Sequence, residues 1–200
     1  MTRQELINEV KTKVDELSAS DDKVVPFSIY NGKPIDSFAD GLLDECAREV
    51  LLNAPAHHLD GSSSSVYPNK NADGSGYFYW SSDWLRILSF KMKEWKRAVT
   101  EFAEPGSDVA LKQSNVFLRG GVCKPVCVLG HRSGWRVVEY YSVKRSHDVD
   151  WCVVVRVCPA EDVSVALQPA LTWFCASKVL QILGRSDLAS TAYERGKVLL

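Results

Sequence analysis

The spacing of apolar residues changes twice along this chain, and this change constrains the fold more than any other feature. Near both ends apolar residues recur every three or four positions, as in Leu6, Val10, Val14 and Leu17, which is typical of amphipathic helices. In the middle they alternate with polar residues, which is typical of strands with one buried face. Helices at both ends of a strand-rich middle predict an α+β fold.

The N-terminal part, residues 1–60, is expected to form two helices. In the first, Thr2 and Glu5 are spaced as a capping box, in which each side chain bonds the backbone amide of the other residue, and the helix should end near Ser18. A short strand over 24–30 and a turn at Asn31-Gly32 follow.

The second helix is expected to run from Pro34, in its first turn, to Asn53. Its two faces differ in chemistry. The apolar face is predicted to consist of Ile35, Phe38, Leu42, Cys46, Ala47, Val50 and Leu51. The acidic face carries Asp36, Asp40, Asp44, Glu45 and Glu49.

Residues 61–76 are rich in Gly, Ser and Asn and are expected to form a flexible loop. An inserted antiparallel β subdomain is predicted over 77–160, with the side chains of Leu88, Phe90 and Met92 on one face of a strand. A short helical turn is expected over 109–114. Three further runs, 125–132, 134–143 and 149–158, are expected to form one antiparallel meander.

The C-terminal part, residues 161–200, is expected to add a helix pair that completes a bundle with the N-terminal helices. The first helix should span 164–183 and end at Gly184, and Ser186 should cap the last helix. The apolar stripe of the first helix is predicted as Val165, Leu171, Phe174, Cys175, Val179 and Ile182. The last helix shows a face of small residues together with Tyr193, Leu199 and Leu200, and we expect it to pack on the preceding helix or on a neighbouring protein.

The net charge of −1 hides an uneven distribution. Residues 1–60 carry six Lys and Arg against twelve Asp and Glu, a net charge of −6, whereas residues 84–145 carry twelve against five, a net charge of +7. Opposite charges can attract within one fold, attract a neighbouring copy or face different partners; two solvated faces of unequal composition are the alternative.

No stretch predicts membrane contact or secretion. The first ten residues lack the apolar core of a signal peptide, and no run approaches the ~18 apolar residues of a membrane helix. Six cysteines in 200 residues are too sparse for a disulfide scaffold. We therefore expect a protein made in a cytoplasm, with its cysteines as buried thiols.

The sequence predicts no catalytic residues, no metal ligands and no cofactor. It lacks the G-x-S-x-G, H-E-x-x-H, Walker and G-x-G-x-x-G motifs. Cys123, Cys127 and His131 follow one another at intervals of four residues. Four residues of a strand span ~13 Å, so on a strand these side chains would be too far apart to share a zinc ion. Adjacent His57 and His58 diverge, so they are a poor chelate. A small enzyme with an unrecognised site is a remaining alternative.

The basic β region offers another alternative, a nucleic-acid-binding accessory protein. Basic strands with aromatic residues can bind single strands by stacking and phosphate contact. By sequence pattern, however, the aromatic and charged side chains do not fall on one face, and no RNP or KH signature is present. A polar sheet face is therefore the favoured interpretation.

Four stretches carry a resemblance to a known family. They are TRQELINEV with FADGLLDECAREVLLNAP, then SDWLRILSFKMKEWKRAV, then NVFLRGGVCKPVCVL with RVVEYYSV, and finally ALTWFCASKVLQILGRSDLASTAYERGKVLL. Together they resemble the head–tail connector (adaptor or ring) proteins of tailed bacteriophages, especially the crAss-like short-tailed phages of gut Bacteroidales. The resemblance covers most of the chain outside residues 57–76.

The resemblance implies a structural virion protein with no catalytic residues. Such proteins form a cyclic ring, commonly twelve-fold, in the neck between portal and tail, and the genome passes through it. Implied partners are other copies of the chain, the portal protein and other neck or tail rings, with non-specific contact to genomic DNA in the channel. The implied location is the virion, after assembly in the bacterial host cytoplasm.

A ring of identical subunits needs two different contact patches on each subunit. We expect the acidic residues Asp36, Asp40, Asp44 and Glu49 to approach basic residues of a neighbour. The basic candidates are Lys91, Lys93 and Arg97. Tyr193, Leu199 and Leu200 of the last helix are further candidates for contact with a neighbouring subunit.

Overall fold

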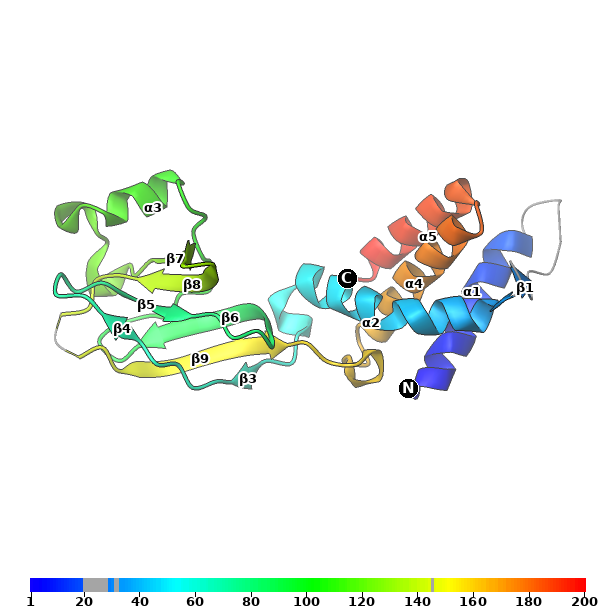
Figure 1. The fold of residues 1–200 in the computed structure, drawn as a ribbon, viewed down its shortest axis with the longest axis horizontal. Helices are drawn as coiled ribbons and strands as arrows, with labels where there is room; N and C mark the ends of the chain where they lie inside the picture. Colours follow the sequence, from blue (N-terminus) through cyan, green and yellow to red (C-terminus); the bar gives the residue numbers. More distant parts are fainter. Residues whose placement is uncertain (20–28, 31–32, 145) are drawn as a thin grey trace. The chain divides into compact units, whose positions relative to one another are not determined.

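The computed structural model describes residues 1–19, 29–30, 33–144 and 146–200. It confirms an α+β fold, in which both ends of the chain form helices and the segment that separates them in the sequence forms antiparallel strands (Figure 1). The chain divides into two compact units. A helical unit comprises Met1–Asp60 and Val157–Leu200, and a β unit comprises Gly61–Arg156.

The helical unit contains α1 (Arg3–Ala19), α2 (Ile35–Asn53), α4 (Gln168–Ile182) and α5 (Ser186–Val198). Two short strands, β1 (Ile29–Tyr30) and β2 (Lys33–Pro34), pair antiparallel ahead of α2. Short 3₁₀ turns, η1 (Ala56–His58) and η4 (Ala160–Asp162), flank the β unit in the chain. The rest of the expected strand over 24–30, and the expected turn at Asn31-Gly32, lie outside the described residues.

The first helix begins as the capping box predicts. The Thr2 backbone amide donates to the Glu5 carboxylate at 2.7 Å, and the Glu5 amide donates to the Thr2 hydroxyl at 3.3 Å. The side chains of Leu6, Val10 and Val14 are fully buried. The 3.6-residue spacing of these apolar side chains thus directs one face of α1 into the core of the helical unit.

The fourth helix, α4, is the centre of this unit, and α1, α2 and α5 all pack against it. It is buried on nearly every side, so even its polar side chains find internal partners: the Ser177 hydroxyl donates to the Ala189 carbonyl of α5 at 2.8 Å. It ends in a Schellman motif at Gly184, whose φ is +74°. The Arg185 amide donates to the Leu180 carbonyl and the Gly184 amide to that of Gln181.

Two predicted details of the second helix, α2, are wrong. In α2 the buried line runs through Ala39 and Leu43, so Phe38 and Leu42 are only half-buried. Pro34 is the residue before α2, not part of its first turn.

The boundaries of the C-terminal helices also differ from the prediction. The helix predicted from residue 164 begins at Gln168, which leaves Val165 exposed, and Ile182 is exposed at its end. Ser186 is already helical and does not cap α5; the preceding residue, Arg185, makes no side-chain cap hydrogen bond. Gly184 and Arg185 make the Schellman hydrogen bonds that end α4, and α5 begins directly after them at Ser186.

The β unit holds two antiparallel sheets. One contains β3 (Ser62–Ser63), β9 (Val149–Arg156) and β6 (Trp84–Met92), in that order. The other contains β4 (Asn69–Lys70), β5 (Gly76–Tyr79), β8 (Trp135–Tyr140) and β7 (Cys127–Arg132). The remaining elements of this unit are α3 (Asp108–Gln113), η2 (Val116–Leu118) and η3 (Gly121–Cys123).

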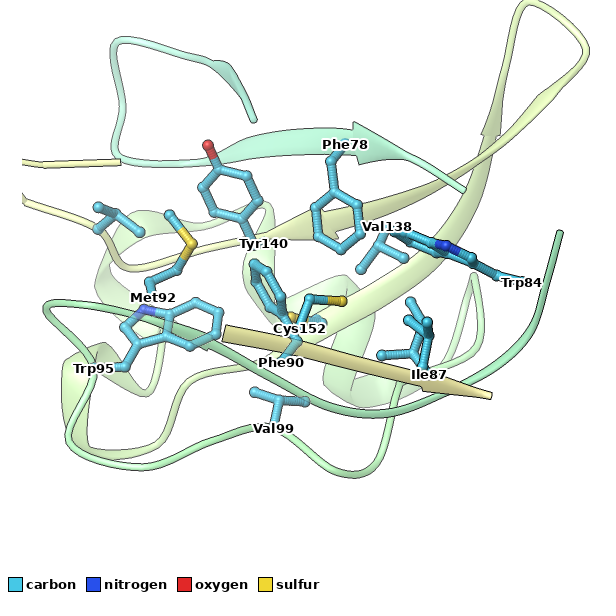
Figure 2. Close-up of a cluster of buried hydrophobic side chains, with 13 residues drawn as sticks. Phe78, Trp84, Ile87, Phe90, Met92, Trp95, Val99, Val138, Tyr140 and Cys152 are labelled. Carbon is cyan, nitrogen blue, oxygen red and sulfur yellow. The ribbon is translucent and has the colours of Figure 1, made fainter. Parts of the chain in front are cut away.

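An aromatic core lies between these two sheets (Figure 2). The rings of Phe78 on β5 and Phe90 on β6 have centroids 4.8 Å apart, and Trp95 meets Phe90 edge to face at 5.6 Å. Tyr140 of β8 reaches into the same cluster, where its hydroxyl bonds the ring nitrogen of His147 at 2.7 Å. Burial raises the pKa of Tyr140 to about 12.

The predicted meander of three strands is wrong. The β7 and β8 strands form a hairpin through Ser133 and Gly134, both with positive φ, but β9 pairs with β6 and β3 in the other sheet. Leu88 is also misassigned, because the register shifts between Ile87 and Ser89. This irregularity breaks the alternation, so Ile87 and Phe90 are both buried while Leu88 is half-exposed.

Residues 61–76, expected to form a flexible loop, instead contribute short strands to both sheets. Ser62 and Ser63 pair with β9, and Asn69 and Lys70 pair with β5. The side chains of these four residues are exposed. Backbone hydrogen bonds to the neighbouring strands, and not burial of apolar side chains, therefore hold this segment in position. A reading of composition cannot detect pairing of this kind.

Candidate assembly surfaces

The acidic face of α2 is held by a cation of its own unit. Arg3 of α1 donates to Asp40 at 2.6 Å and to Asp44 at 3.0 Å. The Asp44 carboxylate also accepts the backbone amide of Ala160 at 3.0 Å. The hydrogen bond from Arg3 is the main reason that the pKa of Asp44 lies below its usual value. These carboxylates therefore tie α1, α2 and the segment before α4 together.

The other acidic candidates are paired in the same unit. Lys11 of α1 lies 3.5 Å from Asp36, and Lys178 of α4 lies 3.0 Å from Glu49 and 2.7 Å from Glu45. The acidic face is thus part of the packing of the bundle. Contact with a neighbouring subunit through it stays a prediction, and it would have to add to these pairs or exchange them.

The basic candidates lie in the β unit, and two of them have acidic partners there. Lys91 donates to Asp150 at 2.7 Å, and Lys93 lies 3.6 Å from Asp148. Arg97 is exposed and has no ion pair within the described part of the chain. Acidic and basic candidates therefore belong to different units, each largely neutralised locally.

The candidates on α5 divide between packing and exposure. The ring of Tyr193 meets Phe174 of α4 edge to face, with centroids 5.0 Å apart. Leu199 is exposed, and Leu200 is half-buried at the end of the helix. The expected packing of this helix on the preceding one is confirmed, and it depends on Gly196, where a Cβ would come within 3.3 Å of Phe174.

An open apolar groove of about 710 Å³ runs beside α5. Trp173 of α4 lines it, together with Val198 and Leu199, and Glu194 and Arg195 contribute charged atoms. Val198 is 85% exposed although it is a valine. We call this feature the α5 groove.

The sequence did not single out a prominent exposed apolar feature of the described part of the chain. It is a projection of the β unit formed by α3 and η2, residues 108–118, which we call the α3 arm (Figure 1). Phe117 in η2 is 94% exposed. Four further apolar side chains of the arm are exposed: Val109, Leu111, Val116 and Leu118. A run of large apolar residues behind a Pro-Gly turn was the available signal, but its exposure is invisible in sequence.

The α3 arm is fixed at both ends. At its start, Ala103 bridges to the edge of β7 through two backbone hydrogen bonds of 2.9 Å. At its end, the largely buried Arg119 donates to the Asp73 carboxylate at 2.7 Å and to the Gln113 carbonyl at 2.8 Å. The hydrogen bond from Arg119, helped by Ser75, lowers the pKa of Asp73 to about 2. The arm is therefore held in place with its apolar side chains outward.

The outer face of the four-stranded sheet combines aromatic rings with arginine. Phe78 and Val138 point into the core, so their neighbours along the strands point outward. The outward set includes Tyr77, Tyr79, Glu139, Trp135 and Arg132. The Arg132 guanidinium lies 4.3 Å from the centroid of the Tyr77 ring and bonds Glu139 at 2.8 Å, and Trp135 is 64% exposed. The expectation that aromatic and charged side chains occupy different faces is therefore wrong, because the strand register brings them together.

The cysteines and histidines considered as metal ligands do not gather at one site. His57 and His58 do not diverge as expected, because their rings meet edge to face with centroids 4.1 Å apart. Cys127 is buried in the β core, whereas Cys123 and His131 are exposed. Burial raises the pKa of the Cys127 thiol and brings that of Cys152 to about 12. No group of three or more metal-ligating side chains occurs among the residues with described positions.

Within the described ranges, no helix is both long enough and apolar enough to span a membrane. Comparison with protein-family models and with curated proteins finds no match.

Proposed function

We propose that this protein is a non-catalytic structural component of a tailed phage that assembles into a ring in the portal–tail neck, through which DNA passes. The observation that carries the proposal is the α3 arm, a fixed projection with five exposed apolar side chains. An exposed apolar cluster is costly to keep in water unless a partner covers it. The resemblance of the chain to phage connector proteins supplies the kind of partner.

A cyclic ring is consistent with two different apolar surfaces on one chain. Each subunit of a ring uses two different patches, one for each neighbour. The chain has one apolar projection on the β unit and one apolar groove on the helical unit. Portal protein and other neck or tail rings are the proposed neighbours above and below, with a twelve-fold ring as the proposed stoichiometry.

Purified virions provide the direct test. Mass spectrometry of particles from the source culture should find the protein at a copy number close to that of the portal protein, and electron microscopy should show it as a ring in the neck. Native mass spectrometry of the protein mixed with portal protein should give the same ring. Absence from purified particles would overturn the proposal.

A second candidate function, binding of single-stranded nucleic acid, is favoured by the outer sheet face. Tyr79 and Trp135 are exposed there beside Arg132. Stacking on aromatic rings contributes about 1–3 kcal/mol per base and tolerates any sequence. An accessory protein that binds nucleic acid would use this face without a ring.

Fluorescence anisotropy with a labelled oligothymidine tests this function. Binding should weaken steeply with salt, and the double variant Y79A/W135A should bind at least ~10-fold more weakly, on the scale of two lost stacking contacts. Tyr193, which is 38% exposed on α5 of the helical unit and not part of this sheet, provides the control Y193A. Equal binding by all three proteins, or no binding, would exclude the function.

A further inference from the structure

The α3 arm and the α5 groove match each other in kind. The arm exposes the ring of Phe117, and the groove is lined by Trp173, Val198 and Leu199. Its volume of about 710 Å³ lies within the ~300–1,000 Å³ range of pockets that bury small molecules or large side chains. Aromatic side chains are the commonest anchors in such pockets at protein interfaces.

The charges beside the two surfaces are also complementary. The arm carries Asp108 at the start of α3 and Lys112 four residues later, and neither has an ion pair within the described part of the chain. Along the groove, α5 carries Glu194 and Lys197, which lie 3.3 Å apart on one exposed turn. An antiparallel approach of α3 to α5 would set each acid beside a base.

We propose that the α3 arm of one copy docks into the α5 groove of a second copy, with Phe117 against Trp173 and Val198. In this contact Lys112 faces Glu194 and Asp108 faces Lys197. The inference deepens the proposed function, on which it rests for the closure of a ring. Exposed ion pairs add little affinity, so the apolar contact supplies the energy and the charges set the direction of docking.

The area of the arm is adequate for most of one side of an interface. Burying an aromatic side chain removes ~150–250 Å² from water, so the five exposed side chains of the arm offer on the order of 500 Å². A stable interface buries about 800 Å² per partner. The charged flanks of α3 and the rim of the groove supply the remainder.

A second copy is favoured over an unrelated protein because one chain carries both halves of the contact. In a head-to-tail arrangement every arm and every groove is covered, and repetition requires only one kind of contact. Pairing of two arms with each other would leave the grooves of both copies open. The arrangement is therefore heterologous.

Two charge-introducing variants of the full chain test the contact by complementation. F117E blocks the arm and leaves the groove intact, whereas V198E blocks the groove and leaves the arm intact. In sedimentation velocity, the wild-type protein is expected to self-associate with rising concentration, and each variant alone should stay monomeric. An equimolar mixture of the two variants should form a 1:1 dimer and nothing larger, because only one intact contact remains.

The matched controls are Y67E and V165E, at residues that are 85% and 76% exposed outside both surfaces. They should associate like the wild type, and circular dichroism should show that all four variants are folded. The proposal is overturned if the wild type stays monomeric at its highest soluble concentration and a photo-reactive phenylalanine analogue at Phe117 does not crosslink to α5. It is also overturned if F117E associates like the wild type, or if the mixture stays monomeric.

These outcomes separate the docking contact from the proposed function. If the protein forms rings in the virion neck in which Phe117 is exposed, the proposed function is supported and the docking contact is refuted. If the protein forms dimers that depend on the α3 arm but is absent from virions, the docking contact is supported and the proposed function is refuted.

Discussion

The helical unit and the β unit solve the problem of stability in different ways. The helical unit surrounds one central helix, α4, with helices from both ends of the chain, and small residues such as Ala192 and Gly196 allow close approach. The β unit is one continuous segment whose two sheets enclose large aromatic rings such as Phe78 and Phe90. The helical unit therefore depends on close backbone packing, whereas the β unit depends on filling volume between sheets.

The two units also differ in what they leave outside. Ion pairs connect the helices of the helical unit, as Arg3 connects α1 with Asp40 and Asp44 of α2. In the β unit the largely buried Arg119 pairs with the more exposed Asp73 and holds an apolar arm outward. Ion pairs thus stabilise the packing of helices in the helical unit, whereas in the β unit an ion pair holds the exposed α3 arm in position.

The largest expected effect comes from the aromatic core of the β unit. Phe90 is fully buried, and Phe90→Ala should lower the free energy of unfolding of this unit by about 3–5 kcal/mol, because it leaves a cavity between the sheets. Hydrogen exchange read by mass spectrometry should show the loss of protection in β6 and β9. The counterpart is Leu171→Ala in α4, expected to cost about 2–5 kcal/mol in the helical unit. Equal loss of protection in both units from either change would contradict two separate cores.

Overpacking between α4 and α5 should have a smaller effect. Gly196→Leu forces a side chain against Phe174 and Trp173, where even a Cβ would come within 3.3 Å, so a cost of about 1–3 kcal/mol is expected. Calorimetry should show a lower Tm. Thr191→Leu, on the exposed side of the same helix, is the control and should leave Tm nearly unchanged. An unchanged Tm for the Gly196 variant would mean that α5 can move away from α4 at little cost.

Helix caps allow a direct comparison of the units. Thr2→Ala removes the cap of α1, which packs on α4, and should lower the free energy of unfolding of the helical unit by about 0.5–2 kcal/mol. Ser107→Ala removes the hydroxyl that accepts the Ala110 amide at the start of α3. Since α3 is a short exposed helix, hydrogen exchange should rise in the arm alone. Global destabilisation by the Ser107 variant would show that the arm belongs to the core of the β unit.

The smallest expected effect is a pH dependence of the pair that anchors the arm. The pKa of Asp73 is depressed from 3.8 to about 2 in the folded protein, so folding favours its ionised form. The resulting stabilisation is complete above the unfolded pKa of 3.8 and is lost as the pH falls through about 2. Urea midpoints of the β unit between these pH values should fall more steeply for the wild type than for Asp73→Asn. The carboxylate is largely exposed, so added salt should reduce the difference; identical pH profiles would rule out the anchor.

Local features of the helices were predictable because their causes lie within a few residues. The capping box of Thr2 and Glu5 and the left-handed Gly184 at the end of α4 each depend on hydrogen bonds inside one turn. Predictions of helix boundaries were wrong where tertiary packing outweighed the spacing of apolar residues. Val165 fits the apolar stripe of α4 by spacing but precedes the helix and is exposed.

The candidate surfaces were less predictable because they depend on contacts between distant residues. The sequence predicted Lys91 as a residue of a subunit interface. In the structure its charge is instead neutralised by Asp150 on the neighbouring strand. Phe117 resembled an ordinary apolar residue, and its near-complete exposure follows from the anchoring of Arg119 on Asp73, 46 residues earlier. Neither partner is adjacent in the chain.

By itself the sequence determined the four main helices, the strand-rich middle, and that helices from both ends of the chain flank a β insertion in the sequence, because periodicity records which side of each element is buried. Only the tertiary structure decided that β9 pairs with β6 and not with β8. Alternation of apolar and polar residues indicates which face of a strand is buried, but it does not indicate which strand is its partner. The tertiary structure also decided that Trp135 and Arg132 share an outer face and that the α3 arm stands outside the core, since both follow from strand register and long-range hydrogen bonds.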